Sequence, residues 1–148
     1  MQRGVETTYT HPKTGLTFEY PSDFELYVVE EDGGEIIIGE KAEYGLAFQI
    51  FIQPFDEPGP LTVERIRRDL PDMVMEGAGE SELLRTADPV VTFLGFDHTL
   101  GPIPQAWFVR DGYLYQVAYY APPEDDPNPL SVALFRGFLQ HITFTSPA

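Results

Sequence analysis

This sequence has no cysteine and only two lysines among its 148 residues. The missing cysteine excludes disulfide bonds, thiolate nucleophiles and thiolate-bound metals. No apolar run reaches the roughly 18 residues that a membrane-spanning helix needs, so we expect no direct membrane insertion. The first 15 residues also lack the apolar segment of a signal peptide. Either the chain is cytoplasmic, or a signal or lipid anchor was removed from it.

Positive charge is scarce in general, since the formal net charge is −15 and the isoelectric point is about 4.3. Such a chain repels phosphate backbones and anionic lipid headgroups, so nucleic acid is not an expected partner. Basic residues gather only at Arg65, Arg67 and Arg68, between Glu64 and Asp69. We interpret this cluster as local charge pairing on a solvated helix face, with anion binding as the alternative.

Hydrophobic residues, by contrast, make up 43% of the chain and include 11 Phe and 8 Tyr. This composition is typical of folded proteins, and a chain of this length buries roughly 70% of its unfolded surface. We therefore predict one domain over residues 1–148, in which the polar residues 1–10 form a flexible tail.

Alternating apolar and polar residues predict several β-strands. The first begins near Leu16 and ends at Pro21, which blocks further pairing. Two glycines between the second and third strands favour a hairpin turn, and Gly95 within the sixth is interpreted as a bulge. These strands are expected over residues 16–20, 24–30, 35–39, 46–55, 83–86 and 90–98.

The strongest local signal is a hairpin over residues 105–120. Two alternating runs are joined by Asp111-Gly112, a pair typical of a two-residue type I′ turn. In that register Ala106 and Phe108 share a face with Tyr115, while Trp107 lies on the opposite face. Both faces are apolar, so both are expected to be covered.

Two helices are predicted. Thr62 is a suitable cap for the first, whose buried stripe is Val63, Ile66 and Leu70, and Pro71 limits its length. Asn128 and Pro129 begin the second, whose stripe is Leu130, Leu134, Phe135, Phe138 and Leu139, and a last strand follows at residues 142–144. The predicted fold class is α+β, an antiparallel sheet of about seven or eight strands with two main helices.

The order of these elements resembles the PsbP-like family, named for an extrinsic subunit of photosystem II and including small bacterial lipoprotein domains. The resemblance covers roughly residues 9–145 and is carried by the opening GLTFEYPSDF with Gly15, Tyr20 and Pro21, and by the final helix running into HITF. Phe24 stands where related chains tend to have Trp. The resemblance implies an α/β/α sandwich and a non-enzymatic, usually extracytoplasmic module that docks on or assembles a larger complex. It transfers no functional residue.

Catalytic groups are sparse. His11, His98 and His141 are scattered, and no pair of them has a metal-ligand spacing. Asp97 and His98 are adjacent in a predicted strand and so point to opposite faces. A nucleophile elbow is also missing from the sequence. We predict no enzyme activity, no catalytic residue, no metal site and no cofactor.

Carboxylates concentrate in the loop Glu124-Asp125-Asp126-Pro127-Asn128. Their oxygens are ligands of the kind that Ca²⁺ prefers, but the order of an EF-hand loop is missing. A solvated acidic loop is the favoured interpretation, and a calcium site stays open as the alternative. The same interpretation applies to the acidic stretches at residues 30–32 and 56–57.

Aromatic residues crowd the 105–120 hairpin. Amphipathic aromatics are enriched at recognition surfaces, and two helices are a narrow cover for a wide sheet. The candidate interaction face consists of Trp107, Tyr113, Tyr115, Tyr119 and Tyr120. The competing interpretation is a core packed on both faces.

The function predicted from the sequence is a non-enzymatic binding or assembly module of a larger, envelope-associated protein complex, with an unidentified protein partner. The alternative is a carrier of a small ligand or cation with a pocket beside the aromatic hairpin, and an enzyme comes third. The resemblance favours an extracytoplasmic location. The oligomeric state stays open.

Overall fold

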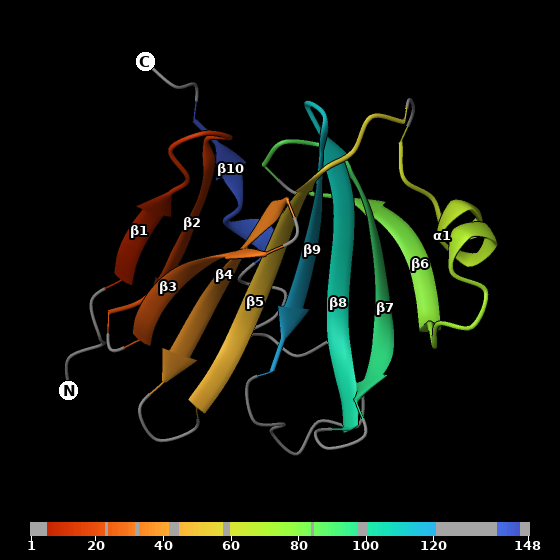
Figure 1. The fold of residues 1–148 in the computed structure, drawn as a ribbon, viewed down its shortest axis with the longest axis horizontal. Coiled ribbons are helices and arrows are strands. Elements are labelled where there is room, and N and C mark those ends of the chain that lie inside the picture. The colour runs from red at the N-terminus through yellow and green to blue at the C-terminus, as the bar shows by residue number, and fades with distance from the viewer. Residues whose placement is uncertain are drawn as a thin grey trace.

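The computed structural model describes residues 6–22, 24–31, 33–41, 45–57, 60–83, 85–97, 101–120 and 139–145. In these ranges the chain forms ten strands and one helix (Figure 1). The strands are β1 (Glu6–Thr10), β2 (Leu16–Pro21), β3 (Phe24–Glu31), β4 (Gly34–Lys41), β5 (Gly45–Pro54), β6 (Glu76–Glu82), β7 (Pro89–Asp97), β8 (Gly101–Arg110), β9 (Tyr113–Tyr119) and β10 (Thr143–Phe144). The helix is α1 (Val63–Asp69).

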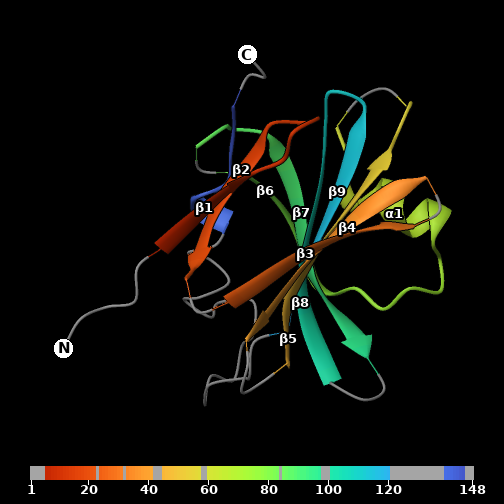
Figure 2. The ribbon, with the colours of Figure 1, turned by 60° about the vertical axis from the view of Figure 1, so that its left-hand side comes forward.

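The strands form two antiparallel sheets. The large sheet has seven strands in the order β3-β4-β5-β9-β8-β7-β6, and the small sheet has three in the order β1-β2-β10. The small sheet packs against one face of the large sheet, where Phe18 of β2 meets Phe48 of β5 edge to face at 5.7 Å between ring centroids. Figure 2 shows β1 and β2 stacked beside the large sheet. We call the face of the large sheet that the small sheet covers the inner face.

The inner face carries the larger core. Alternation along each strand directs every second side chain to this face. Several of these side chains are fully buried, and Phe108 stacks on Tyr115 with a centroid separation of 4.9 Å. They belong to one hydrophobic cluster, the inner-face cluster. Its buried members are Leu16, Phe18, Ile37, Phe48, Ile50, Ile52, Leu83, Val90, Ala106, Phe108, Tyr115, Val117, Tyr119 and Ile142.

The opposite, outer face is covered by α1 and its flanking loops. Thr62 caps the helix as predicted, with its side chain accepting a hydrogen bond from the N–H of Arg65. Ile66 is the buried residue of the helix. It packs with Trp107 and Leu114 in a second hydrophobic cluster, the outer-face cluster. Figure 1 places α1 at the β6 end of the large sheet, away from β3. Among the described residues, those that cover the outer face therefore lie only at its β6 end.

The predicted hairpin is confirmed as β8 and β9. Asp111 and Gly112 have φ angles of 50° and 83°, the positive values that a type I′ turn requires. Phe108 pairs with Tyr115 and Trp107 pairs with Gln116, so the predicted division of side chains between the two faces is also confirmed. The predicted hairpin of β3 and β4 is present too, with Gly33 at a φ angle of 82° in its turn.

The predicted α+β class is wrong, because the described chain is mostly β with one short helix. Two strands were not foreseen. β1 lies in the segment expected to be a flexible tail, and β6 in a segment for which no strand was predicted. The second predicted helix lies mostly outside the described residues, among which Leu139 and Gln140 are helical. The same observation contradicts the α/β/α sandwich that the resemblance implied.

Three local predictions are also corrected. Leu83, Arg85 and Thr86 do not form the predicted strand, because the N–H of Leu83 donates to the carbonyl of Asp88 and the N–H of Ala87 donates to the carbonyl of Leu83, which closes a turn. Gly95 is not a bulge, since the pairing of β7 with β8 continues through it without a shift. Leu70 is 44% exposed because the helix ends at Asp69 and leaves it at the C-cap.

In the described part of the chain, no helix has the length and apolar character needed to cross a membrane.

Candidate functional site

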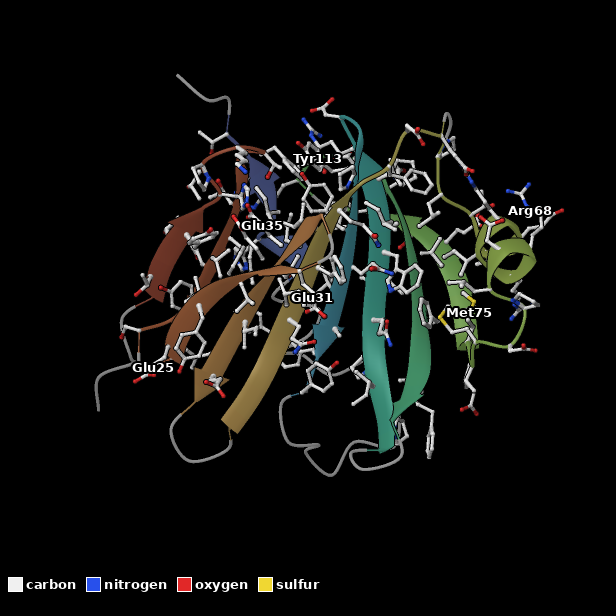
Figure 3. The ribbon with its side chains drawn as sticks, in the orientation of Figure 1. Glu25, Glu31, Glu35, Arg68, Met75 and Tyr113 are labelled. Carbon is white, nitrogen blue, oxygen red and sulfur yellow. The ribbon has the colours of Figure 1, made fainter. Side chains whose placement is uncertain are left out.

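A cavity of about 450 Å³ opens where the two sheets meet at one end of the molecule. Its walls come from the β1–β2 loop, the β3–β4 turn, the end of β5 and the start of β9. Figure 3 labels Glu31, Glu35 and Tyr113, which line it from β3, β4 and β9. Its volume lies within the range of small-molecule pockets. Residues far apart in the sequence thus share one concave surface.

The β1–β2 loop places a histidine inside this end of the protein. The N–H of His11 donates to the carbonyl of Leu16 at 2.8 Å, and the N–H of Gly15 donates to the carbonyl of His11 at 3.0 Å. Gly15 has a φ angle of 79°, which glycine adopts without a steric cost. The loop therefore closes tightly, and only 3% of His11 is exposed.

Both ring nitrogens of His11 are engaged. Nδ1 accepts hydrogen bonds from the backbone N–H groups of Lys13 at 3.2 Å and Thr14 at 3.1 Å. The ring proton consequently sits on Nε2, which donates to Oε2 of Glu35 at 2.5 Å. This contact joins the loop of the small sheet to β4 of the large sheet. Both ring nitrogens therefore have hydrogen-bond partners within the protein.

Glu35 is held as a carboxylate. The hydrogen bond from His11 lowers its pKa, burial opposes this effect, and Coulomb attraction to Lys13 adds to the lowering. The ammonium of Lys13 lies 3.5 Å from Oε1 of Glu35. The side chain of Glu35 is 20% exposed, whereas that of Lys13 is 70% exposed. Glu35 is thus a fixed charge in the cavity wall, beside a lysine that reaches into solvent.

A second side chain of the same loop also touches the large sheet. The hydroxyl of Tyr115 is hydrogen-bonded to Thr14, an interaction that lowers its pKa while burial, the larger effect, raises it. Tyr115 is 1% exposed and belongs to the inner-face core. The loop is consequently fixed at two points, His11 and Thr14, and the cavity has a rigid wall.

Negative charge dominates the cavity. Glu30 and Glu35 are direct cross-strand partners in β3 and β4, and both line it together with Glu31. Like charges directly opposite each other in an antiparallel pair repel. Lys13 is the one basic side chain in the described lining. The site is therefore suited to a ligand that brings positive charge.

The predicted aromatic face is mostly core. Trp107, Tyr115 and Tyr119 are buried, and Tyr113 and Tyr120 are half-buried. Trp107 packs in the outer-face cluster, where its Nε1 donates to Oε1 of Gln105 at 2.9 Å, whereas Tyr115 and Tyr119 belong to the inner-face cluster. Among the five, Tyr113 lines the cavity. The packing of the hairpin follows the competing interpretation, a core on both faces.

The other sequence candidates divide into three groups. His98 and the acidic loop 124–128 lie outside the described residues. His141 is exposed, in the turn before β10. The arginine cluster shows the predicted charge pairing, with Arg68 bonded to Asp69 at 3.1 Å and Arg65 bonded to Glu57. In the described ranges, His, Asp and Glu residues do not gather in any group of three that could hold a metal ion.

The pairing of His11 with Glu35 was not predicted. One signal was available: Glu35 shares a strand face with Ile37, and Ile37 is fully buried. The three consecutive isoleucines at 36–38 made this signal ambiguous, because they place apolar side chains on both faces of β4 and do not indicate which face is buried. The partner of Glu35 lies in another sheet, so no local pattern identifies it.

Comparison with known proteins found no family model that matches this sequence and no match among curated proteins.

Proposed function

We propose that this chain is a non-enzymatic binding domain whose cavity holds a small organic ligand with a positively charged amine. The observation that carries the proposal is the cross-strand pair of Glu30 and Glu35 in the cavity wall. An amine between two facing carboxylates relieves their repulsion and forms charge-assisted hydrogen bonds. The hydrogen bond from His11 already holds Glu35 in place, so less conformational entropy is lost when the ligand binds.

Support for a non-enzymatic role comes from the same groups. Catalytic acids and bases are tuned toward the working pH, whereas the pKa of Glu35 is lowered and its carboxylate stays ionised. The ring of His11 is committed at both nitrogens. These residues are arranged to present a charge rather than to transfer a proton.

The test is thermal unfolding with putrescine, a small diamine, and with butanediol, its neutral counterpart. A ligand that binds the folded state raises the melting temperature in a concentration-dependent way. We expect putrescine to do so and butanediol to have no effect. Calorimetric titration of Glu35→Gln should show at least tenfold weaker binding of putrescine, because the carboxylate is lost while the amide still accepts from His11.

The matched control is Glu76→Gln, which removes the same charge from an exposed position on β6, outside the cavity. It should bind putrescine as the unmodified protein does. Equal weakening in both variants would mean that the diamine responds to overall negative charge, and the proposed site would be rejected.

A second function, assembly into a larger protein complex, is favoured by a separate observation. Tyr27, Val28 and Val29 are three consecutive apolar residues of β3, and all are exposed. Contiguous exposed apolar surface marks interaction sites in folded proteins. The envelope location came from the resemblance, whose expected fold the structure contradicts, so this proposal retains only a protein partner.

A further inference from the structure

The two edges of the large sheet differ in how they are protected. β6 consists of small and acidic residues, its pairing with β7 shifts between Glu76 and Gly79, and Glu80 accepts a hydrogen bond from the N–H of Val63 at the start of α1. Acidic side chains, irregular pairing and a covering element are established ways of blocking an exposed strand edge. β6 is therefore unsuited to accept another strand.

β3, at the opposite edge, is regular, and its acidic residues Glu25, Glu30 and Glu31 lie toward its two ends. It pairs with β4 over eight consecutive residues without a register shift, and it contains no proline or lysine. Among the described strands it has a neighbour on one side only. Its central residues Tyr27, Val28 and Val29 are 41%, 45% and 44% exposed, and as consecutive strand residues they alternate between the two faces. A long, regular, apolar edge of this kind is a template for strand addition.

The surface beside this edge is also apolar. Val29, Ile36 and Phe51 follow one another as cross-strand partners on the outer face, and Tyr27 pairs with Ile38. Ile36, Ile38 and Phe51 are half-buried. The hydroxyl of Tyr27 donates to Oε2 of Glu25 at 2.8 Å, which holds the ring in place. An added strand would thus extend an existing apolar strip.

Charge decides which strand fits. Glu25 lies near one end of β3, and Glu30 and Glu31 lie at the other (Figure 3). If two copies of β3 paired antiparallel about Val28, Glu25 of each copy would lie opposite Glu31 of the other. If they paired about the midpoint between Tyr27 and Val28, Glu25 would lie opposite Glu30. Like charges directly opposite destabilise a pair, so a second copy is disfavoured. Basic residues at these two places are favoured instead.

We propose that β3 binds an extended segment of a partner protein, with an apolar centre and a Lys or Arg at each end, as an additional antiparallel strand. Backbone hydrogen bonds along the edge supply affinity, and the glutamates at the two ends select the basic flanks. The edge shares Glu30 and Glu31 with the cavity lining, but its apolar centre of Tyr27, Val28 and Val29 lies outside that lining, and the inference does not depend on the proposed amine ligand.

The probe is the fluorescent peptide KTVYVTK, whose terminal lysines match the spacing from Glu25 to Glu31. We expect saturable binding in fluorescence polarisation that weakens with added salt. The peptide ETVYVTE, with reversed end charges, should bind at least tenfold more weakly. So should KTVPVTK, because its central proline lacks an N–H and interrupts the strand. Equal binding of KTVYVTK and ETVYVTE would overturn the proposed selection by charge.

Two variants locate the site. Val29→Lys places a charge in the apolar centre of the edge and should weaken KTVYVTK binding at least tenfold. Val74→Lys makes the same change at a residue that is 53% exposed in the loop before β6, and it should have no effect. Circular dichroism and melting temperature check that both variants fold. Loss of binding in both variants, or in neither, would contradict a site at β3.

Sedimentation without peptide tests the competing occupant. A concentration-dependent dimer that Val29→Lys abolishes would assign the edge to a second copy and overturn the proposal. The two binding functions are separated by crossing the variants: Val29→Lys should still bind putrescine, and Glu35→Gln should still bind KTVYVTK.

Discussion

The two faces of the large sheet are built from the same strands, yet they differ in what covers them. On the inner face Ile37, Ile50 and Val117 are fully buried beneath the small sheet. On the outer face Ile36 and Phe51, which lie on two of the same strands, remain half-buried because α1 covers the far end. Alternation supplies apolar side chains to both faces, and the covering element decides which of them become core. The part of the outer face that the described residues leave uncovered lies beside β3.

The largest expected effect is the loss of an aromatic ring from the inner face. Phe108 is fully buried, stacks on Tyr115 and meets Phe144 edge to face at 6.2 Å. Phe108→Ala should lower the free energy of unfolding by about 3–5 kcal/mol. Phe51→Ala on the outer face should cost only about 1 kcal/mol, because that side chain is only partly buried. Urea denaturation measures both, and similar losses would contradict the distinction between the faces.

A smaller effect is expected from the polar contact between the two sheets. Glu35→Gln replaces the charged acceptor of the His11 bond, so we expect it to lower stability at neutral pH by about 1–2 kcal/mol. The folded state lowers the pKa of Glu35 from its ordinary 4.5. The stabilisation is therefore complete above that value and is lost as the pH falls below it, through the lowered pKa of the folded protein.

Urea midpoints measured from pH 7 to pH 3 check this dependence. The difference between the unmodified protein and Glu35→Gln should shrink as the medium becomes acidic. A difference that stays constant over this range would show that the contact contributes through geometry and not through charge.

The smallest effect is expected at the start of the outer-face helix. Thr62→Ala removes the acceptor for the N–H of Arg65 and should cost about 1 kcal/mol. Thr62→Ser keeps a hydroxyl at the same place and should restore most of that loss. Thermal unfolding of the two variants provides the measurement, and an alanine variant as stable as the serine variant would exclude the capping contribution.

Local signals predicted the elements that local chemistry determines. Asp111-Gly112 predicted the β8–β9 turn because few residue pairs adopt two positive φ angles, and Thr62 predicted the start of α1 because its hydroxyl satisfies a free N–H. β6 was missed for the opposite reason. Its glycines and glutamates have low strand propensity, and it is a strand because β7 supplies the pairing.

The candidate site was beyond local reasoning. His11 and Glu35 are 24 residues apart and belong to different sheets, so only tertiary packing shows that they meet. The aromatic residues were the more visible signal, but large aromatics also form cores, and three of the five predicted residues are buried. A glutamate on the same strand face as a core isoleucine was the better indicator, and it required the buried face of β4 to be known.

The short strand β10 also affects how the protein folds. It pairs with β2, and the hydroxyls of Thr17 and Thr145 meet at 2.9 Å across a sequence separation of 128 residues. Contacts over such separations have a high loop-closure cost and form slowly. We therefore expect the hairpins of the large sheet to form early and the small sheet to close last. The N–H of Thr145 donates to the carbonyl of Gly15 in the β1–β2 loop at 2.8 Å, so the loop that carries His11, and with it the wall of the cavity, would be completed only at this last step.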